Sequence, residues 1–240
     1  MSEKQFSGFP RNFLMLLAEN SFNDSKVYYE TVKEQIKQSA TVPMRNLCAD
    51  LSGQLFDMDE HMNLIPSRMV SRVRRDTRVA KNENMYRNNM WAMFMRDKYA
   101  YGYFPCMWFE VQPGGWSCGV GIFNSDPTFM GCYRETILQY PKEFERAVKS
   151  VLKSGAETDL EQYKKPKPGS ENIEKRMLPY FNAKSLFFIY YSTDLEPLFD
   201  GSIENILSEK FRAFRPMYKF IASVSDKLTE KGLNTPRRMR

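Results

Sequence analysis

Apolar residues in the first sixty positions recur three or four places apart, which is the spacing of an amphipathic helix. This pattern predicts a short helix around residues 13–17, a second helix up to about residue 39 and a third beyond residue 42. The run Asn23-Asp24-Ser25 is expected to cap the second helix. Thr41 is expected to cap the third, with Pro43 in its first turn.

The middle of the chain changes to the period of two that is typical of strands. The turn Pro113-Gly114-Gly115 predicts a hairpin. Gly119 and Gly121 share one face of their strand, where the missing side chains let another backbone or a ligand come close. Strands are predicted at residues 69–75, 89–95, 106–112, 116–123 and 186–191.

Helical spacing returns toward the C-terminus. Asp126 and Pro127 are expected to open a helix that is interrupted near Pro141. Residues 203–224 outline a last helical region, with Pro216 able to bend it. Helices at both ends and strands in the centre predict an α+β fold, with a central antiparallel sheet of about five strands packed with N-terminal and C-terminal helices.

The chain shows no repeat and no clear linker over its 240 residues, so we expect one domain at residues 1–231 and a frayed basic tail at residues 232–240. Its apolar runs are shorter than the roughly 20 residues that cross a bilayer, and the N-terminus lacks a signal peptide. The 4 cysteines have no paired spacing and are interpreted as reduced, mostly buried thiols. We therefore expect a cytoplasmic protein without membrane association. The sequence carries no signal for an oligomeric state.

Several classes of chemistry are excluded by what the sequence lacks. His61 is the single histidine, which rules out zinc sites and mechanisms built on two histidines, and we interpret it as an exposed loop residue. P-loop, dinucleotide-binding, serine-hydrolase and zinc-peptidase motifs do not occur. We predict no metal and no cofactor, and the catalytic residues of any reaction stay unknown. Asp76, Tyr86 and Glu110 are the candidate acids and bases, with Glu110 expected at an exposed edge.

Positive charge is concentrated in residues 68–87, which carry seven basic and two acidic side chains, a local charge of +5 against +6 for the whole chain. Strand alternation would place Arg72, Arg74 and Asp76 on one face, with Val73 and Arg75 on the other. Clustered guanidinium groups repel one another unless an anion is present, and their geometry suits bidentate contact with phosphate or carboxylate. The stretch is therefore the main candidate site.

The same stretch resembles the family labelled domain of unknown function 2461 (DUF2461), whose signature is Arg-x-x-Arg-Asp-x-Arg-Phe-Ser-Lys-Asp-Lys-x-Pro-Tyr-Lys. The residues that match in register are Arg72, Arg75, Asp76, Arg78, Lys81 and Tyr86, with Arg87 in place of the final lysine. The chain departs from the signature at Val79, Ala80, Asn82, Glu83 and Met85. Ala80 and Asn82 replace a hydroxyl and a carboxylate. If relatives use those groups in catalysis, this chain is expected to bind without turnover.

Weaker similarity to the family extends over nearly the whole chain, through Asn23, Asp24, Tyr28, Tyr29, Lys33 and Pro43, then Gly119, Gly121, Arg134 and Ile137, and finally residues 211–218. The resemblance implies one intact domain and highlights the basic stretch as its site. The resemblance does not imply any particular catalysed reaction.

We predict that Arg72, Arg75, Asp76, Arg78 and Lys81 bind a small anionic ligand that carries phosphate or carboxylate. Tyr86, Lys33 and Arg134 are plausible second contributors to this ligand-binding site. The alternatives are a metal-independent enzyme acting on a phosphorylated or carboxylated substrate, and a partner-binding protein whose arginines form a structural ion-pair network. Nucleic acid is a further reading that the sequence does not favour, because aromatic residues of a sheet usually belong to the core.

Overall fold

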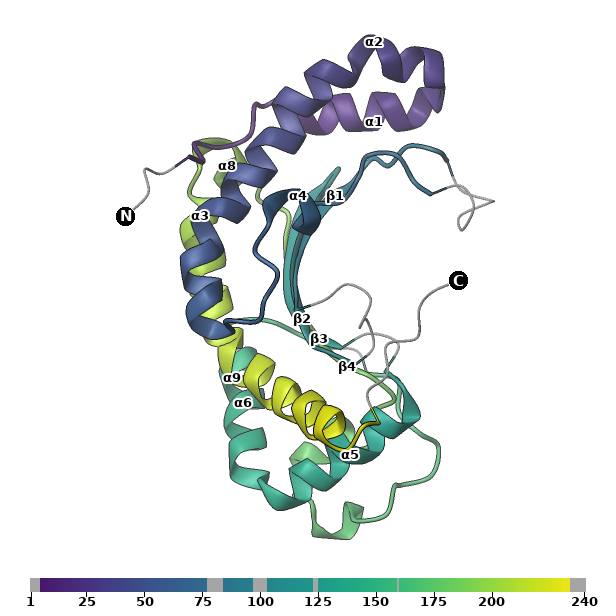
Figure 1. Cartoon of the computed structure of the whole chain (residues 1–240), viewed down its shortest axis with the longest axis vertical. Coiled ribbons are helices and arrows are strands. Elements are labelled where there is room, and N and C mark those ends of the chain that lie inside the picture. Colours follow the sequence, from purple (N-terminus) through teal and green to yellow (C-terminus); the bar gives the residue numbers. More distant parts are fainter. Residues whose placement is uncertain (1–4, 77–83, 97–102, 123–124, 159, 234–240) are drawn as a thin grey trace. The chain divides into compact units, whose positions relative to one another are not determined.

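The computed structural model describes residues 5–76, 84–96, 103–122, 125–158 and 160–233 (Figure 1). By their internal contacts they divide into two compact units. The first unit comprises Met1–Phe94, Trp108–Cys118 and Tyr191–Glu209, and the second comprises Met95–Met107, Gly119–Tyr190 and Lys210–Arg240. The single domain expected over residues 1–231 stays a prediction. The frayed tail expected at residues 232–240 also stays a prediction, because residues 234–240 lie outside the described part of the chain.

The sheet has four strands in the order β1 (Met90–Phe94), β2 (Cys106–Gln112), β3 (Gly115–Ile122) and β4 (Leu186–Ser192), all antiparallel. The predicted α+β class is confirmed, but the fifth strand expected at residues 69–75 is wrong. Pro66 opens helix α4 (Pro66–Met69), which takes up the start of that run. Beyond α4 the described part of the segment pairs through two isolated bridges, Val70 to Ala92 and Arg74 to Tyr86, and not through a named strand.

In the first unit, α1 (Phe13–Asn23) is followed by one long helical stretch made of α2 (Lys26–Ile36), the π-helical turn η1 (Lys37–Thr41) and α3 (Val42–Met58). Ser25 caps α2 as predicted, since its hydroxyl accepts the Tyr28 N–H. The cap predicted at Thr41 is wrong, because Thr41 has helical backbone angles and no capping hydrogen bond.

The π turn explains how the helix continues through Pro43. A proline inside an α-helix clashes with the carbonyl four residues earlier and supplies no N–H. Here the helix widens just before it, and the Val42 N–H bonds to the Lys37 carbonyl, five residues back. Such π turns are rare and frequently lie at functional sites.

The second unit contains α5 (Pro127–Gln139), α6 (Pro141–Lys153) and α7 (Leu178–Phe181), with short 3₁₀ turns at Ser170–Asn172 and Lys175–Met177. Asp126 caps α5 as predicted and accepts the Thr128 N–H at 2.8 Å. The predicted interruption near Pro141 is also confirmed, because α5 ends at Gln139 and α6 begins at Pro141. Helix α8 (Glu196–Asp200) belongs to the first unit, and α9 (Ile203–Glu230) passes from the first unit into the second after Glu209.

Aromatic rings dominate the cores of both units. In the first, Phe9 and Phe13 are buried and stack with ring centroids 4.6 Å apart. In the second, Tyr133, Phe144 and Phe220 form a cluster with centroid distances of 5.1 to 6.3 Å. Aromatic pairs at these separations add to the stability gained from burial.

Gly121 lets two strands approach closely within the second unit. A Cβ atom added there would lie 2.4 Å from the Leu186 carbonyl oxygen and 2.5 Å from the Phe187 Cα. The close backbone approach predicted for the glycine face is therefore present at Gly121, and the approaching backbone is that of β4.

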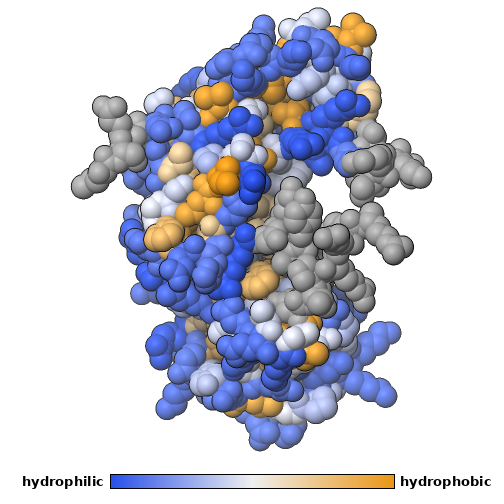
Figure 2. All heavy atoms as spheres, viewed as in Figure 1, coloured by the Kyte–Doolittle hydropathy of each residue, from blue (hydrophilic) through white to orange (hydrophobic). Residues whose placement is uncertain are grey.

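All four cysteines are free and buried, in agreement with the sequence interpretation. Burial raises the pKa of the Cys48 and Cys106 thiols to about 12, so neither forms a reactive thiolate near neutral pH. No helix in the described part of the chain is both long and apolar enough to span a membrane. The face shown in Figure 2 is mainly hydrophilic, with hydrophobic side chains in small separate groups.

Candidate functional site

The predicted basic motif lies in an extended segment that pairs with the residues just before β1. The Arg75 N–H donates to the Met85 carbonyl at 2.7 Å, and the Arg87 N–H donates to the Val73 carbonyl at 2.9 Å. Together with the two isolated bridges, these bonds hold the motif as an irregular antiparallel ribbon within the first unit.

Side chains alternate along this ribbon. Val73 is buried at 7% exposure, whereas Arg72, Arg74 and Asp76 are exposed. Arg72 and Arg74 therefore share the face that the alternation predicts. Arg75 lies on the other face and is only half-buried.

Arg75 holds the ribbon together. Its Nη1 donates to the Asn84 carbonyl at 3.0 Å and to the Tyr86 carbonyl at 3.1 Å, both on the facing segment. Hydrogen bonds from a charged donor are stronger than neutral ones. These two contacts of Arg75 stabilise the ribbon, and its role in ligand binding stays a prediction.

Tyr86 is fixed between the ribbon and the helices. Its N–H donates to the Asp24 carboxylate at 3.1 Å, its carbonyl accepts the Ser21 hydroxyl at 3.0 Å, and its ring stacks on Tyr29 at 4.7 Å. Its own hydroxyl is buried and has no hydrogen-bond partner in the described part of the chain. Burial raises the pKa of Tyr86, and the nearby Arg74 opposes this rise.

The unpaired hydroxyl gives a test of what Tyr86 contributes. Because a buried, unbonded hydroxyl costs desolvation free energy, Tyr86→Phe should leave the free energy of unfolding unchanged or raise it by up to about 1 kcal/mol. Tyr133→Phe is the matched control: the Tyr133 hydroxyl is also buried but donates to the Tyr180 carbonyl at 3.2 Å. Its removal should cost about 1 kcal/mol in urea unfolding. A larger loss from Tyr86→Phe than from Tyr133→Phe would contradict this assignment.

A groove of about 640 Å³ lies beside the motif in the first unit. One wall comes from α2, η1 and α3, and the other from α4 and the segment that follows it. We call it the cationic groove, and its lining consists of Tyr29, Lys33, Glu34, Ile36, Lys37, Thr41, Arg45, Ser67, Val70, Ser71, Arg72, Val73 and Arg74.

Of the described residues that line this groove, five carry a cationic side chain and one, Glu34, carries a carboxylate. Arg45, Arg72 and Arg74 are exposed, and none of them forms an ion pair with a residue that the structure describes. Three guanidinium groups thus line one groove, and none of them is paired with an acid of the described chain. This arrangement attracts anions, because like charges gathered in a concave surface reinforce one another's field.

The two lysines of the groove have weak partners. Lys33 pairs with Glu30, which raises its pKa, and Lys37 pairs with Glu34 at 3.1 Å. The pKa of Glu34 is lowered, first by a hydrogen bond from Gln38 and then by Lys37. Both pairs are exposed to solvent, where ion pairs contribute little to stability, so an incoming anion can replace either glutamate.

Arg134 does not line the cationic groove, because it belongs to α5 in the second unit and is buried at 9% exposure. Its Nε, Nη1 and Nη2 donate to the carbonyls of Phe181, Met130 and Ala183 at 3.0, 2.7 and 2.9 Å. Burial lowers the pKa of this guanidinium. The contacts of Arg134 fix the loop after α7, and its predicted role in ligand binding is not tested by them.

The cationic groove brings together two of the predicted site residues, Arg72 and Lys33. Asp76, Arg75 and Tyr86 belong to the same ribbon but are not part of its lining. Arg78 and Lys81 lie outside the described residues. Sequence reasoning missed the contributions of Lys37 and Arg45 to this groove, because residues spaced by four drift away from one face of a straight α-helix.

Residues 12–220 of the chain match the model of the family described as conserved hypothetical protein (DUF2461). No curated protein matches the chain. The matched region runs from the residue before α1 into α9 and includes the motif, the cationic groove and all four strands. This extent confirms the resemblance inferred from the central motif, and the chain belongs to the DUF2461 family.

Proposed function

We propose that the cationic groove binds a small anionic ligand that carries phosphate or carboxylate. The observation that supports this most is the presence of Arg45, Arg72 and Arg74 around one groove with no ion pair to any described residue. Exposed arginines are common, but three that come from two separate segments and line the same groove are best explained by a shared anionic partner.

The size and polarity of the groove favour a small polar ligand. Its volume of about 640 Å³ lies within the roughly 300–1,000 Å³ of small-molecule sites. Hydroxyl groups of Tyr29, Thr41, Ser67 and Ser71 also line it and can donate hydrogen bonds to anionic oxygens. The groove therefore offers both charge and neutral donors to one ligand.

Thermal unfolding in the presence of different anions tests the proposal. Phosphate, sulfate, sugar phosphates and nucleotides at millimolar concentration form the panel. A ligand present at a hundred times its Kd stabilises the folded chain by about 2.7 kcal/mol, which raises the Tm of a protein of this size by several degrees. Chloride at the same ionic strength gives the baseline.

Variants then locate the effect. Arg45→Gln and Arg72→Gln should each weaken binding of the best anion about tenfold or more, because each removes a charged hydrogen-bond donor. Arg68→Gln is the matched control, since Arg68 is an exposed arginine of α4 that does not line the groove. Equal effects from all three variants, or no response to any anion, would rule out the groove as a specific site.

Nucleic acid binding is the competing reading, and its salt dependence separates the two. Binding through bulk charge falls steeply between 50 and 200 mM salt, by roughly 10³-fold or more for many phosphate contacts. A small ligand held by a few donors should lose much less.

We also propose a cytoplasmic location, because four free, buried cysteines suit a reducing compartment.

A further inference from the structure

We propose that the second unit contains a separate binding site, between α6 and α9, for an organic anion that joins one acidic group to a flat apolar body. This α6–α9 groove has a volume of about 440 Å³ and shares no lining residue with the cationic groove. It lies wholly within the second unit, so the proposal stands independently of the function proposed above.

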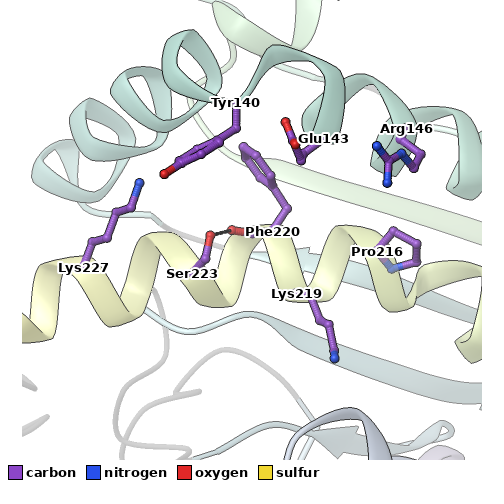
Figure 3. A pocket seen from close by; sticks show the side chains of 8 residues that line it. All are labelled: Tyr140, Glu143, Arg146, Pro216, Lys219, Phe220, Ser223 and Lys227. Atoms are coloured by element: carbon purple, nitrogen blue, oxygen red, sulfur yellow. Dashed lines mark hydrogen bonds between the residues drawn. The ribbon is translucent and has the colours of Figure 1, made fainter.

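The floor of the α6–α9 groove is apolar. Phe220 and Pro216 of α9 line it together with Tyr140, which joins α5 to α6 (Figure 3). The Phe220 ring is held from behind by Phe144, with centroids 5.1 Å apart, and it keeps 7% exposure. Tyr140 is 41% exposed. Phe220 itself is buried, so the accessible aromatic surface comes mainly from Tyr140, and such a surface favours a flat apolar group over a hydrated inorganic ion.

Cationic groups lie at both ends of this floor. Figure 3 shows Lys227 reaching toward the Tyr140 hydroxyl at one end and Arg146 near Pro216 at the other. The Lys227 Nζ already bonds to the Gln139 side chain at 3.1 Å and lies 4.8 Å from the centre of the Tyr140 ring. Lys227 is thereby fixed in place, whereas Arg146 forms no ion pair with a described residue. Arg146 is the group left to receive an acid.

The remaining charges set the number of negative charges that the groove accepts. Glu143 lies between Tyr140 and Arg146 in the lining and has no ion pair in the described chain. Its carboxylate repels negative charge anywhere nearby, so a ligand whose one acidic group lies at Arg146 is favoured over a ligand with two acidic groups. Lys219 points away from the floor in Figure 3 and adds only a long-range attraction. A single acidic group facing Arg146, with the apolar part over Phe220 and Tyr140, satisfies all of these contacts.

Titration calorimetry with a matched pair of probes tests the proposal on the full chain. Naphthalene-1-acetate carries a flat apolar body and one carboxylate, and naphthalene-1-acetamide has the same body without the charge. We expect the acetate to bind at least tenfold more tightly than the amide, because a charge-assisted bond to Arg146 is present only in the acetate complex. Inorganic phosphate at 10-fold excess should not displace it.

Substitutions at two lining positions, Arg146 and Ser223, locate the probe. Arg146→Gln should reduce the preference for the acetate to about threefold or less, while Arg212→Gln, a change to an exposed arginine of α9 outside the groove, should keep it. Ser223→Leu should weaken both probes about tenfold, since it fills the groove beside Phe220. Any one of four results would overturn the proposal. These are equal affinity for the two probes, an unchanged preference in Arg146→Gln, displacement of the acetate by phosphate, and no binding of the acetate at millimolar concentration.

Discussion

Replacing Arg134 with leucine is expected to cost roughly 3–5 kcal/mol of the free energy of unfolding, without any ligand present. The guanidinium is the donor that reaches the carbonyls of Phe181 and Ala183, and leucine would leave both without it inside the second unit. The Met130 carbonyl suffers less, because it lies one turn earlier within α5, where the backbone N–H four residues later is its helical partner. Urea unfolding followed by circular dichroism measures the loss.

Two further variants sharpen the interpretation of Arg134. Arg134→Lys keeps the charge, but its single ammonium group cannot reach the three carbonyls that the planar guanidinium reaches. We therefore expect it to recover less than half of the lost stability. Arg146→Leu, on the neighbouring helix α6, removes an exposed arginine and should change stability by no more than about 0.5 kcal/mol. A stable Arg134→Leu protein that no longer binds anions would instead favour the role in ligand binding predicted from the sequence.

Gly121→Ala should be the second severe change, with a loss of roughly 3 kcal/mol. The added methyl would lie 2.4 Å from the Leu186 carbonyl oxygen and 2.5 Å from the Phe187 Cα. Both are backbone atoms of β4, so no side chain can rotate to make room. Strands β3 and β4 would have to separate locally, with the loss of interstrand hydrogen bonds.

Gly131→Ala is the control for this prediction. Gly131 lies inside α5, where an added Cβ meets nothing within 4 Å. Alanine is the better helix former, so this change should stabilise the chain by up to about 1 kcal/mol. If the two substitutions shifted the urea midpoint equally, the close approach of β3 and β4 would not be a feature of the folded protein.

Most of the fold could be predicted from the sequence because its elements are strongly periodic. The caps at Ser25 and Asp126, the interruption at Pro141 and the hairpin at residues 113–115 each rest on local chemistry that tertiary contacts do not override. The run at residues 69–75 alternates like a strand, but within the described residues it pairs with β1 and the segment before it through isolated bridges and not through a continuous ladder. Pro66 turns its first residues into α4, and alternation alone does not carry that information.

The site was predictable only in part, for a geometric reason. Arg72 could be assigned from the motif, but its partners in the groove come from a helix that is remote in sequence. On that helix Tyr29, Lys33, Lys37, Thr41 and Arg45 are spaced by four, and in a straight α-helix such a series drifts by about 40° per step. It does not predict a shared face. The π turn at Lys37–Thr41 takes up part of the drift, so that all five residues line one groove.

The π turn also decides how the groove tolerates changes of chain length, independently of residue chemistry. Because a π turn is an α-helical turn with one extra residue, loss of one residue between Lys37 and Thr41 would restore an ordinary α-helix and leave the faces of α2 and α3 nearly unchanged relative to each other. Loss of one residue between Lys33 and Lys37 would instead rotate the preceding part of α2 by about 100° around the helix axis and move Lys33 out of the groove. Among members of the family, the first deletion is therefore compatible with the same ligand, whereas the second should accompany a change of ligand even where every charged residue is retained.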